Sequence, residues 1–191
     1  MRVFRAGEAL RSGLLTRHEL AAHHRRLLPG VYADGRSPLS LEDRIVAAWL
    51  WSRRRAAISG LAASAMHGAK WVDPRTPIEL NHARDKSPAG VVVYRDTLLK
   101  SETVILRGMP VTSVERTAFD LARRLSGVAA VQRLDSLARA TGFRSEDVLA
   151  VAAAHPRVRG RRRVAGLLDL VDAGAQSPKE TWLRMLLIEA G

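Results

Sequence analysis

The sequence contains no cysteine, and this absence narrows the chemistry that is open to the protein. A chain without thiols has no disulfide framework, no thiolate nucleophile and no cysteine-based zinc site. Long apolar runs are also lacking: none approaches the roughly 20 residues of a membrane-spanning helix, and the first residues lack the apolar core of a signal peptide. We therefore expect a cytoplasmic protein that makes no membrane contact and binds no cofactor.

Acidic side chains are scarce beside basic ones. The 31 Lys and Arg residues outnumber the 19 Asp and Glu residues, which gives a formal net charge of +12. Arginine dominates because only four of the basic residues are lysines, and its guanidinium group binds phosphates and guanine edges with two donors at once. DNA is therefore the expected partner. The alternative is a GC-rich genome, which would raise the arginine and alanine content without any role in binding.

Residues 1–38 begin with a helical pattern. A first helix is expected over Ala6–Arg11, and Thr16 with Glu19 has the capping-box spacing that begins a second one. A third helix, of the recognition type, is expected between residues 21 and 29, where only about one turn fits.

A strand and two turns complete this N-terminal segment. Pro29-Gly30 interrupts the chain before the strand-like run Val31–Ala33, and Asp34-Gly35 turns it again, as the wing of a winged helix requires. We therefore interpret residues 1–38 as a shortened winged-helix-like DNA-binding module.

Residues 39–172 predict a domain in which a small sheet is followed by helices. Ser40 and Asp43 cap a strong amphipathic helix, and a second capped helix is expected to begin at Thr112. The other helices are expected over Leu61–His67, Val128–Ala140, Ser145–Ala154 and Arg161–Val171. The strands are expected over Ala56–Ile58, Pro77–Leu80, Gly90–Arg95, Val104–Leu106 and Met109–Val111. The expected fold class is therefore α+β, with an α/β domain behind the N-terminal module.

Residues 173–191 read as a linker and one amphipathic helix, which Ser177-Pro178 opens. The apolar face of this helix has no visible partner, so we expect that a following domain is missing. Glu180 lies three residues after Ser177, and its carboxylate is expected to accept a hydrogen bond from the Ser177 amide as a capping box.

Two basic segments in the first third of the sequence are candidates for DNA contact. Thr16, Arg17 and His18 begin a helix whose free backbone N–H groups favour a phosphate, and further charge follows where the recognition element would begin. The alternative is a solvated surface turn. Arg53–Arg55 closes a helix, where its charge either complements the helix dipole or contacts DNA.

The densest charge lies between residues 157 and 163, where five guanidinium groups surround Gly160. Such groups repel one another unless a polyanion or nearby carboxylates neutralise them. An anion site is expected, and internal pairing with Asp169 or Asp172 is the alternative. The complete set of predicted DNA-binding residues is Thr16, Arg17, His18, Arg25, Arg26, Arg54, Arg55, Arg157, Arg159, Arg161, Arg162 and Arg163.

Neither a metal site nor a catalytic site is predicted. His18 and His23 are five residues apart, whereas a zinc-binding helix needs four, and no third ligand lies at a suitable spacing. Arg116 and Asp120 have the spacing of a helical ion pair, which we interpret as structural. His67 and His82 have no identifiable partner, so we expect no enzymatic activity and no DNA cleavage.

Five segments of the sequence form a recognisable series: Leu-Thr-Arg-His-Glu-Leu (15–20), Pro-Gly-Val-Tyr (29–32), Ser-Gly-Leu-Ala-Ala-Ser-Ala-Met-His-Gly-Ala (59–69), Gly-Met-Pro-Val-Thr-Ser (108–113) and Glu-Arg-Thr-Ala-Phe-Asp-Leu-Ala (115–122). Together they resemble actinobacterial AbiEi-type antitoxins of type IV toxin–antitoxin systems. The resemblance covers nearly the whole chain. It implies an N-terminal winged helix, an AbiEi-like α/β domain and, in many such proteins, a C-terminal Vsr-like endonuclease-fold domain.

The segment 177–187 resembles the opening helix of that Vsr-like domain, the rest of which is absent from the sequence. Glu180 would then be a remnant of the acidic residue that this helix carries. The resemblance implies a DNA-binding regulator that acts as an antitoxin, with DNA and a cognate toxin as partners; whether it forms a homodimer stays open. Two alternatives are the N-terminal part of a nuclease-fold protein and a module that neutralises a toxin without touching DNA.

Overall fold

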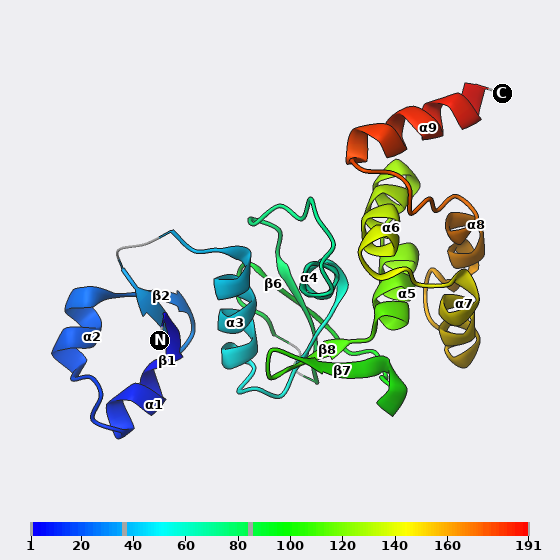
Figure 1. The fold of residues 1–191 in the computed structure, drawn as a ribbon. Helices are drawn as coiled ribbons and strands as arrows, with labels where there is room; N and C mark the ends of the chain where they lie inside the picture. Colours follow the sequence, from blue (N-terminus) through cyan, green and yellow to red (C-terminus); the bar gives the residue numbers. More distant parts are fainter. Residues whose placement is uncertain (1, 36–37, 84–85, 191) are drawn as a thin grey trace. The chain divides into compact units, whose positions relative to one another are not determined.

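The computed structural model describes residues 2–35, 38–83 and 86–190, and its helices and small sheets make an α+β fold (Figure 1). Internal contacts divide the chain into two compact units. The N-terminal unit comprises Met1–Ile58 and Asp73–Thr97, and the C-terminal unit comprises Ser59–Val72 and Leu98–Gly191. None of the described helices is long and apolar enough to cross a membrane. The predicted domain boundaries after residues 38 and 172 stay predictions.

The N-terminal unit begins with two short helices and a three-stranded antiparallel sheet. The helices are α1 (Ala6–Arg11) and α2 (Arg17–His23), and the strands are β1 (Val3–Arg5), β2 (His24–Leu28) and β3 (Val31–Asp34). The sheet has the order β1-β3-β2. Phe4, Ala9 and Leu20 are buried together between these elements, and Tyr32 packs against them. The helices therefore share one small core with the sheet.

The predicted third helix between residues 21 and 29 is wrong. Residues 24–28 form strand β2, which pairs with β3 across the turn at Pro29-Gly30. The ring of His24 packs edge-on against Phe4, with 5.0 Å between the ring centroids. This pairing satisfies the backbone of the segment without a helix, and the hairpin turn lies at Pro29-Gly30. Gly35, after β3, lies in a further turn, as predicted. Strand β1 was not predicted.

The described residues in the rest of the N-terminal unit form one longer helix and three strands. They are α3 (Leu41–Trp51), β4 (Ala57–Ile58), β5 (Ile78–Asn81) and β6 (Val91–Tyr94). Strand β5 pairs with β4 in an antiparallel and with β6 in a parallel manner. The predicted capping box of α3 is confirmed, since Ser40 and Asp43 exchange bonds at its first turn. The predicted helix and strands in this unit are likewise confirmed, with ends shifted by a few residues.

The C-terminal unit is mainly helical. Its elements are α4 (Gly60–Met66), η1 (Lys100–Glu102), β7 (Thr103–Leu106), β8 (Met109–Thr112), α5 (Val114–Arg124), α6 (Gly127–Thr141), α7 (Ser145–Ala154), η2 (Arg161–Arg163), α8 (Val164–Leu168) and α9 (Pro178–Ala190). Helix α5 is central, because α4, α6, α7 and α8 all pack against it. Its apolar face contributes Phe119 and Leu121 to a core that also contains Leu134, Leu137 and Val148.

Two local predictions in this unit are corrected. The cap of α5 is Ser113, whose hydroxyl accepts a hydrogen bond from the Arg116 amide, and not Thr112. Thr112 is still part of strand β8, where it pairs with Thr103, and its hydroxyl lies 2.7 Å from that of Thr117. The helix expected over Arg161–Val171 is a 3-10 turn followed by α8, which ends at Leu168.

Candidate nucleic-acid interface

The first predicted contact group lies at the start of α2. Thr16 is the cap: its hydroxyl accepts from the Glu19 amide, and its own amide donates to the Glu19 carboxylate at 2.8 Å. The Thr16 hydroxyl also donates to this carboxylate at 2.8 Å, and the bonds from the Thr16 amide and hydroxyl hold the pKa of Glu19 below its ordinary value. A carboxylate thus already occupies the helix start, whereas the side chains of Arg17 and His18 are exposed beside it. Contacts to DNA from this turn would come from these two side chains.

Arg25 and Arg26 are exposed on β2, in the hairpin that β2 forms with β3. A pocket of about 330 Å³ begins beside them and is otherwise lined mainly by aliphatic side chains. Arg44 of α3 lines the same pocket, and its guanidinium group also donates to the carbonyl of Pro74. Sequence reasoning missed Arg44, because no local pattern relates α3 to this hairpin.

Arg54 is held by an ion pair within the N-terminal unit. Its two terminal nitrogens lie 2.6 Å and 2.7 Å from the carboxylate oxygens of Glu8, and the Arg5 guanidinium group binds the same carboxylate at 2.7 Å. The Arg54 guanidinium carbon also lies 5.9 Å from the Trp49 ring centroid. The fork that would bind a phosphate is therefore engaged, whereas the neighbouring Arg55 side chain is exposed. A DNA contact by either residue stays a prediction.

The Glu8 ion pair should make stability depend on acid. The hydrogen bond from Arg54, followed by that from Arg5, lowers the pKa of Glu8 from 4.5 to about 2. Because the folded-state pKa is depressed, the stabilisation is complete above the unfolded-state value and is lost as the pH falls from 4.5 towards 2. Free energies of unfolding of Glu8→Gln should therefore change less across this range than those of the unchanged protein. Glu189→Gln, on the exposed surface of α9, is the control and should keep the original pH dependence.

The arginine run at residues 157–163 lies in the C-terminal unit, between α7 and α8. Arg161 donates from Nε to the carbonyl of Ala152 at 2.7 Å, and Arg163 donates to the carbonyl of Arg123. Gly160 packs directly on that same carbonyl: a Cβ atom there would lie 2.2 Å from the oxygen. Backbone contacts with α5 and α7 thus hold the run in place.

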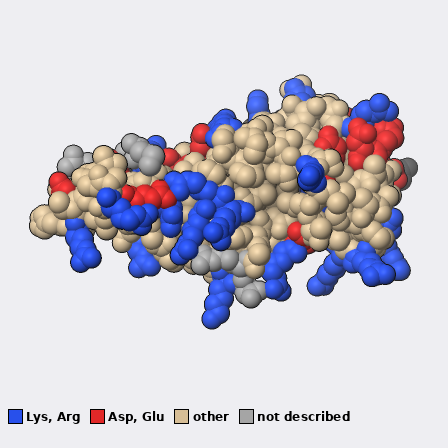
Figure 2. Space-filling view, turned by 90° about the horizontal axis from the view of Figure 1, so that it is seen from below, with Lys and Arg blue, Asp and Glu red and all other residues tan. Residues whose placement is uncertain are grey.

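The charges of this run are not neutralised by carboxylates. In the described part of the chain, none of its five guanidinium groups lies within 4.0 Å of an acidic side chain. The alternative prediction, that Asp169 or Asp172 pairs with the run, is therefore wrong for the described residues. Asp172 lies beside Arg184 instead. Figure 2 shows Lys and Arg side chains standing out from much of the face that it draws, with Asp and Glu in fewer places. The run is therefore a surface that can accept an anion.

A buried charge cluster lies next to this run. The Arg116 guanidinium group contacts Glu102 at 2.7 Å and Asp120 at 3.3 Å, and Asp120 also contacts Arg123 at 2.7 Å. His155 Nε2 lies 2.6 Å from Glu102, two residues before the run begins. The predicted pair of Arg116 and Asp120 is confirmed. Sequence reasoning missed Glu102 and His155, because they come from other elements than Arg116 and no local pattern relates them to it.

The comparison with known families decides the identity of the domain that carries this cluster. A model of the AbiEi antitoxin C-terminal domain matches residues 56–170, which is more than half of the chain. The chain belongs to the AbiEi antitoxin family. A search of curated proteins finds no match.

The matched AbiEi region contains the buried charge cluster and the arginine run, whereas residues 1–55 lie outside it. The family places the protein in a toxin–antitoxin context. The actinobacterial origin, the winged helix and the Vsr-like neighbour that the resemblance implied stay predictions.

The remaining candidate residues of this AbiEi protein have structural partners. Among its described residues, no group of three His, Asp or Glu side chains is placed to hold a metal ion. His67 does have a partner, because its Nε2 lies 2.8 Å from the Thr112 carbonyl oxygen. The Glu180 carboxylate accepts from the Gln176 amide at 2.8 Å and from the Ser177 hydroxyl at 3.0 Å. Glu180 therefore caps the start of α9, as predicted. The backbone amide that donates to its carboxylate is that of Gln176, whereas the predicted one was that of Ser177.

Proposed function

We propose that this AbiEi protein is a DNA-binding transcriptional regulator that acts as the antitoxin of a type IV toxin–antitoxin-like system in the cytoplasm. Its partners would be DNA and a cognate toxin, and it would have no enzymatic activity. The observation that carries this proposal is the arginine run at 157–163, which is exposed over most of its length and has no neutralising carboxylate in the described part of the chain. A polyanion supplies the missing counter-charge.

The arrangement of residues 1–38 supports a winged-helix-like DNA-binding module. Two consecutive helices are followed by the hairpin of β2 and β3, and the sheet has the order β1-β3-β2. In helix-turn-helix proteins the second helix of the pair enters the major groove and contacts bases with its first residues. Helix α2 has this position, and Arg17 and His18 are exposed at its start. We therefore assign the recognition role to α2, and the role of the wing to the hairpin that carries Arg25 and Arg26.

We propose three regions on this basis. Residues 1–38 would contact DNA, residues 39–172 would form the AbiEi-like α/β domain, and residues 173–191 would form a linker and the first helix of a Vsr-like domain. The arginine run would add phosphate contacts from the AbiEi-like domain.

Duplex binding at several salt concentrations tests the proposal. Each phosphate that the protein neutralises should contribute about −0.9 to the slope of the logarithm of the association constant against the logarithm of salt concentration. We expect measurable binding at low salt and a steep decline as salt is added. Absence of binding at the lowest salt concentration, with a folded protein, would contradict the proposal.

A second function is favoured by the exposed apolar side chains of α9. Trp182, Leu183 and Leu187 are each more than half exposed, with Leu187 at 65%. Such a face suits contact with another protein, either a toxin that is neutralised without DNA or a nuclease-fold domain that follows α9. Retained toxin neutralisation by a preparation that does not bind DNA at physiological salt would favour this candidate.

A further inference from the structure

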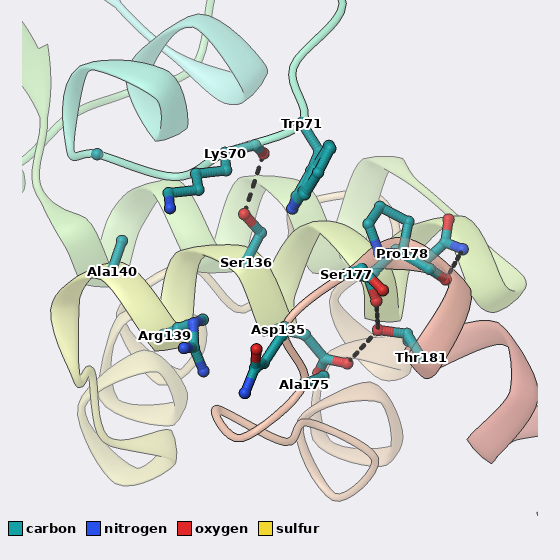
Figure 3. Close-up of a pocket in the computed structure, with 13 residues that line it drawn as sticks. Lys70, Trp71, Asp135, Ser136, Arg139, Ala140, Ala175, Ser177, Pro178 and Thr181 are labelled. Carbon is teal, nitrogen blue, oxygen red and sulfur yellow. Dashed lines mark hydrogen bonds between the residues drawn. The ribbon is translucent and has the colours of Figure 1, made fainter.

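A pocket of about 340 Å³ opens in the C-terminal unit, and the described residues that line it lie outside the arginine run. Its walls are the segment after α4, one face of α6 and the chain that leads into α9 (Figure 3). Lys70 and Arg139 supply two cationic side chains, and Trp71 and Pro178 supply flat apolar surfaces. The volume lies within the range of roughly 300–1,000 Å³ that is typical of small-molecule sites.

The pocket presents positive charge. Asp135 is the acidic residue among the described residues that line it, and its side chain is fully occupied. One carboxylate oxygen accepts from the Asp172 amide, and the other accepts from the Thr181 hydroxyl and from the Arg184 guanidinium group, each at 2.8 Å. Neither Lys70 nor Arg139 forms an ion pair in the described part of the chain. An anion that enters the pocket therefore meets two cations and no competing free carboxylate.

Trp71 is held at this pocket in an unfavourable backbone conformation. Its φ angle is 65°, in the left-handed region that bulky side chains rarely adopt, and the residue is 57% exposed. Two hydrogen bonds from α6 fix the segment: Ser136 donates to the Lys70 carbonyl at 3.0 Å, and Arg133 donates to the Trp71 carbonyl. The indole is thus placed at the pocket and is not drawn into the core. Strain of this kind persists where the surrounding structure enforces it, and it concentrates at ligand sites.

We propose that this pocket binds a nucleotide, with the base against the indole of Trp71 and the phosphate between Lys70 and Arg139. The combination of a flat aromatic surface with two cations matches a ligand that is both a ring and an anion. Inorganic phosphate would use only the cations, and an uncharged ring would use only the indole. The nucleotide comes either from a free mononucleotide or from the end of a single strand. Because Ser177 and Pro178 line the same pocket, the bound nucleotide also contacts the start of α9.

Calorimetric titration of the full chain with adenosine 5′-monophosphate tests this site, with adenosine and inorganic phosphate as partial ligands. Two variants remove one half of the site each: Lys70→Ala the phosphate contact, and Trp71→Gly the stacking surface. Glycine readily adopts the positive φ at position 71, so the second variant should keep the fold. We expect each variant to weaken binding at least about ten-fold, which corresponds to about 1.4 kcal/mol. The partial ligands should each bind more weakly than the monophosphate.

Two matched variants are the controls. Arg53→Gly relieves a similar positive φ of 60° at an exposed residue of the other unit, and Lys100→Ala removes an exposed lysine. Both should bind the monophosphate like the unchanged protein. A single-stranded oligonucleotide with a 5′-phosphate identifies the source. Oligonucleotide binding that Trp71→Gly weakens assigns the strand end, whereas a variant that weakens monophosphate binding and leaves oligonucleotide binding unchanged assigns the free nucleotide.

Two results would overturn the site. One is no binding of either the monophosphate or the oligonucleotide, and the other is that Lys70→Ala and Trp71→Gly weaken the binding of neither ligand. Equal affinity for inorganic phosphate and the monophosphate would also overturn it, because the indole would then contribute nothing. Duplex DNA binding by the two variants should match that of the unchanged protein, so failure of this site is distinguishable from failure of the proposed DNA-binding function.

Discussion

Replacing Asp120 by Ala should lower the free energy of unfolding by about 3–5 kcal/mol, which is the cost of breaking a buried ion pair by removing one partner. The Asp120 side chain is 1% exposed and lies within 3.3 Å of the guanidinium groups of Arg116, Arg123 and Arg124. Without this carboxylate, three closely spaced and largely buried cations lose a shared counter-charge. Arg116 keeps its bond to Glu102, whereas Arg123 and Arg124 lose their contacts to the Asp120 carboxylate.

Denaturant titration followed by circular dichroism measures this loss. Asp120→Asn keeps the size and the acceptor oxygen while removing the charge, so it should lose less stability than Asp120→Ala and give a measurable transition even if the alanine variant does not fold. Asp169→Ala, at an exposed position after α8, is the control and should change stability by no more than about 0.5 kcal/mol. If Asp120→Ala lowered the free energy of unfolding by less than about 1 kcal/mol, the buried charge cluster would not hold α5 in place.

The second large effect is expected in the arginine run. Arg157, Arg159 and Arg162 are exposed, and no hydrogen bond of their side chains is present among the described residues. Replacing the three by Ala should make the salt slope of duplex binding less negative by up to about 2.7, at about 0.9 for each lost phosphate contact. Affinity should fall alike on all DNA sequences, because phosphate contacts carry no base information. Fluorescence anisotropy with several duplexes at a series of salt concentrations measures both quantities.

A paired variant in the N-terminal unit separates charge from sequence reading. Replacing Arg25 and Arg26 by Ala should change the preference among duplexes, since the proposed wing carries both. The arginines at 161 and 163 are left intact in all variants, because their bonds to backbone carbonyls would make a loss of binding ambiguous. If both sets of substitutions lower affinity equally on every duplex, neither surface reads sequence.

The local signals in the sequence predicted much of the fold. Two helix starts were predicted from capping boxes, Thr16 with Glu19 and Ser40 with Asp43. The bonds of a capping box join residues three positions apart, so the local sequence alone specifies them. Strand β2 was mistaken for a helix because its pairing with β3 in the hairpin, and not the pattern of residues 24–28 alone, decides its conformation. Short basic segments without a clear period are poorly specified by sequence alone.

The candidate sites show the same division. The charge of the arginine run is visible in the sequence, but the bond of Arg116 to Glu102 and the approach of His155 depend on how η1, α5 and α7 pack. The pocket beside Trp71 combines a segment after α4 with α6 and the start of α9, and no periodicity relates residues so far apart. Tertiary packing creates both features, so sequence reasoning had no signal for either.

Positions in the arginine run differ in how well they tolerate substitution, and Gly160 is the position that tolerates it least. Exchange of Arg157, Arg159 or Arg162 alters the charge at one point and leaves the backbone where it is, so a lineage can tune the strength of anion binding stepwise. A methyl group at position 160 would instead collide with the Arg123 carbonyl and displace the whole loop from α5. The charged residues can therefore be exchanged one at a time. A single substitution of Gly160, the one uncharged residue among Arg159–Arg163, would instead move every guanidinium group of the run at once.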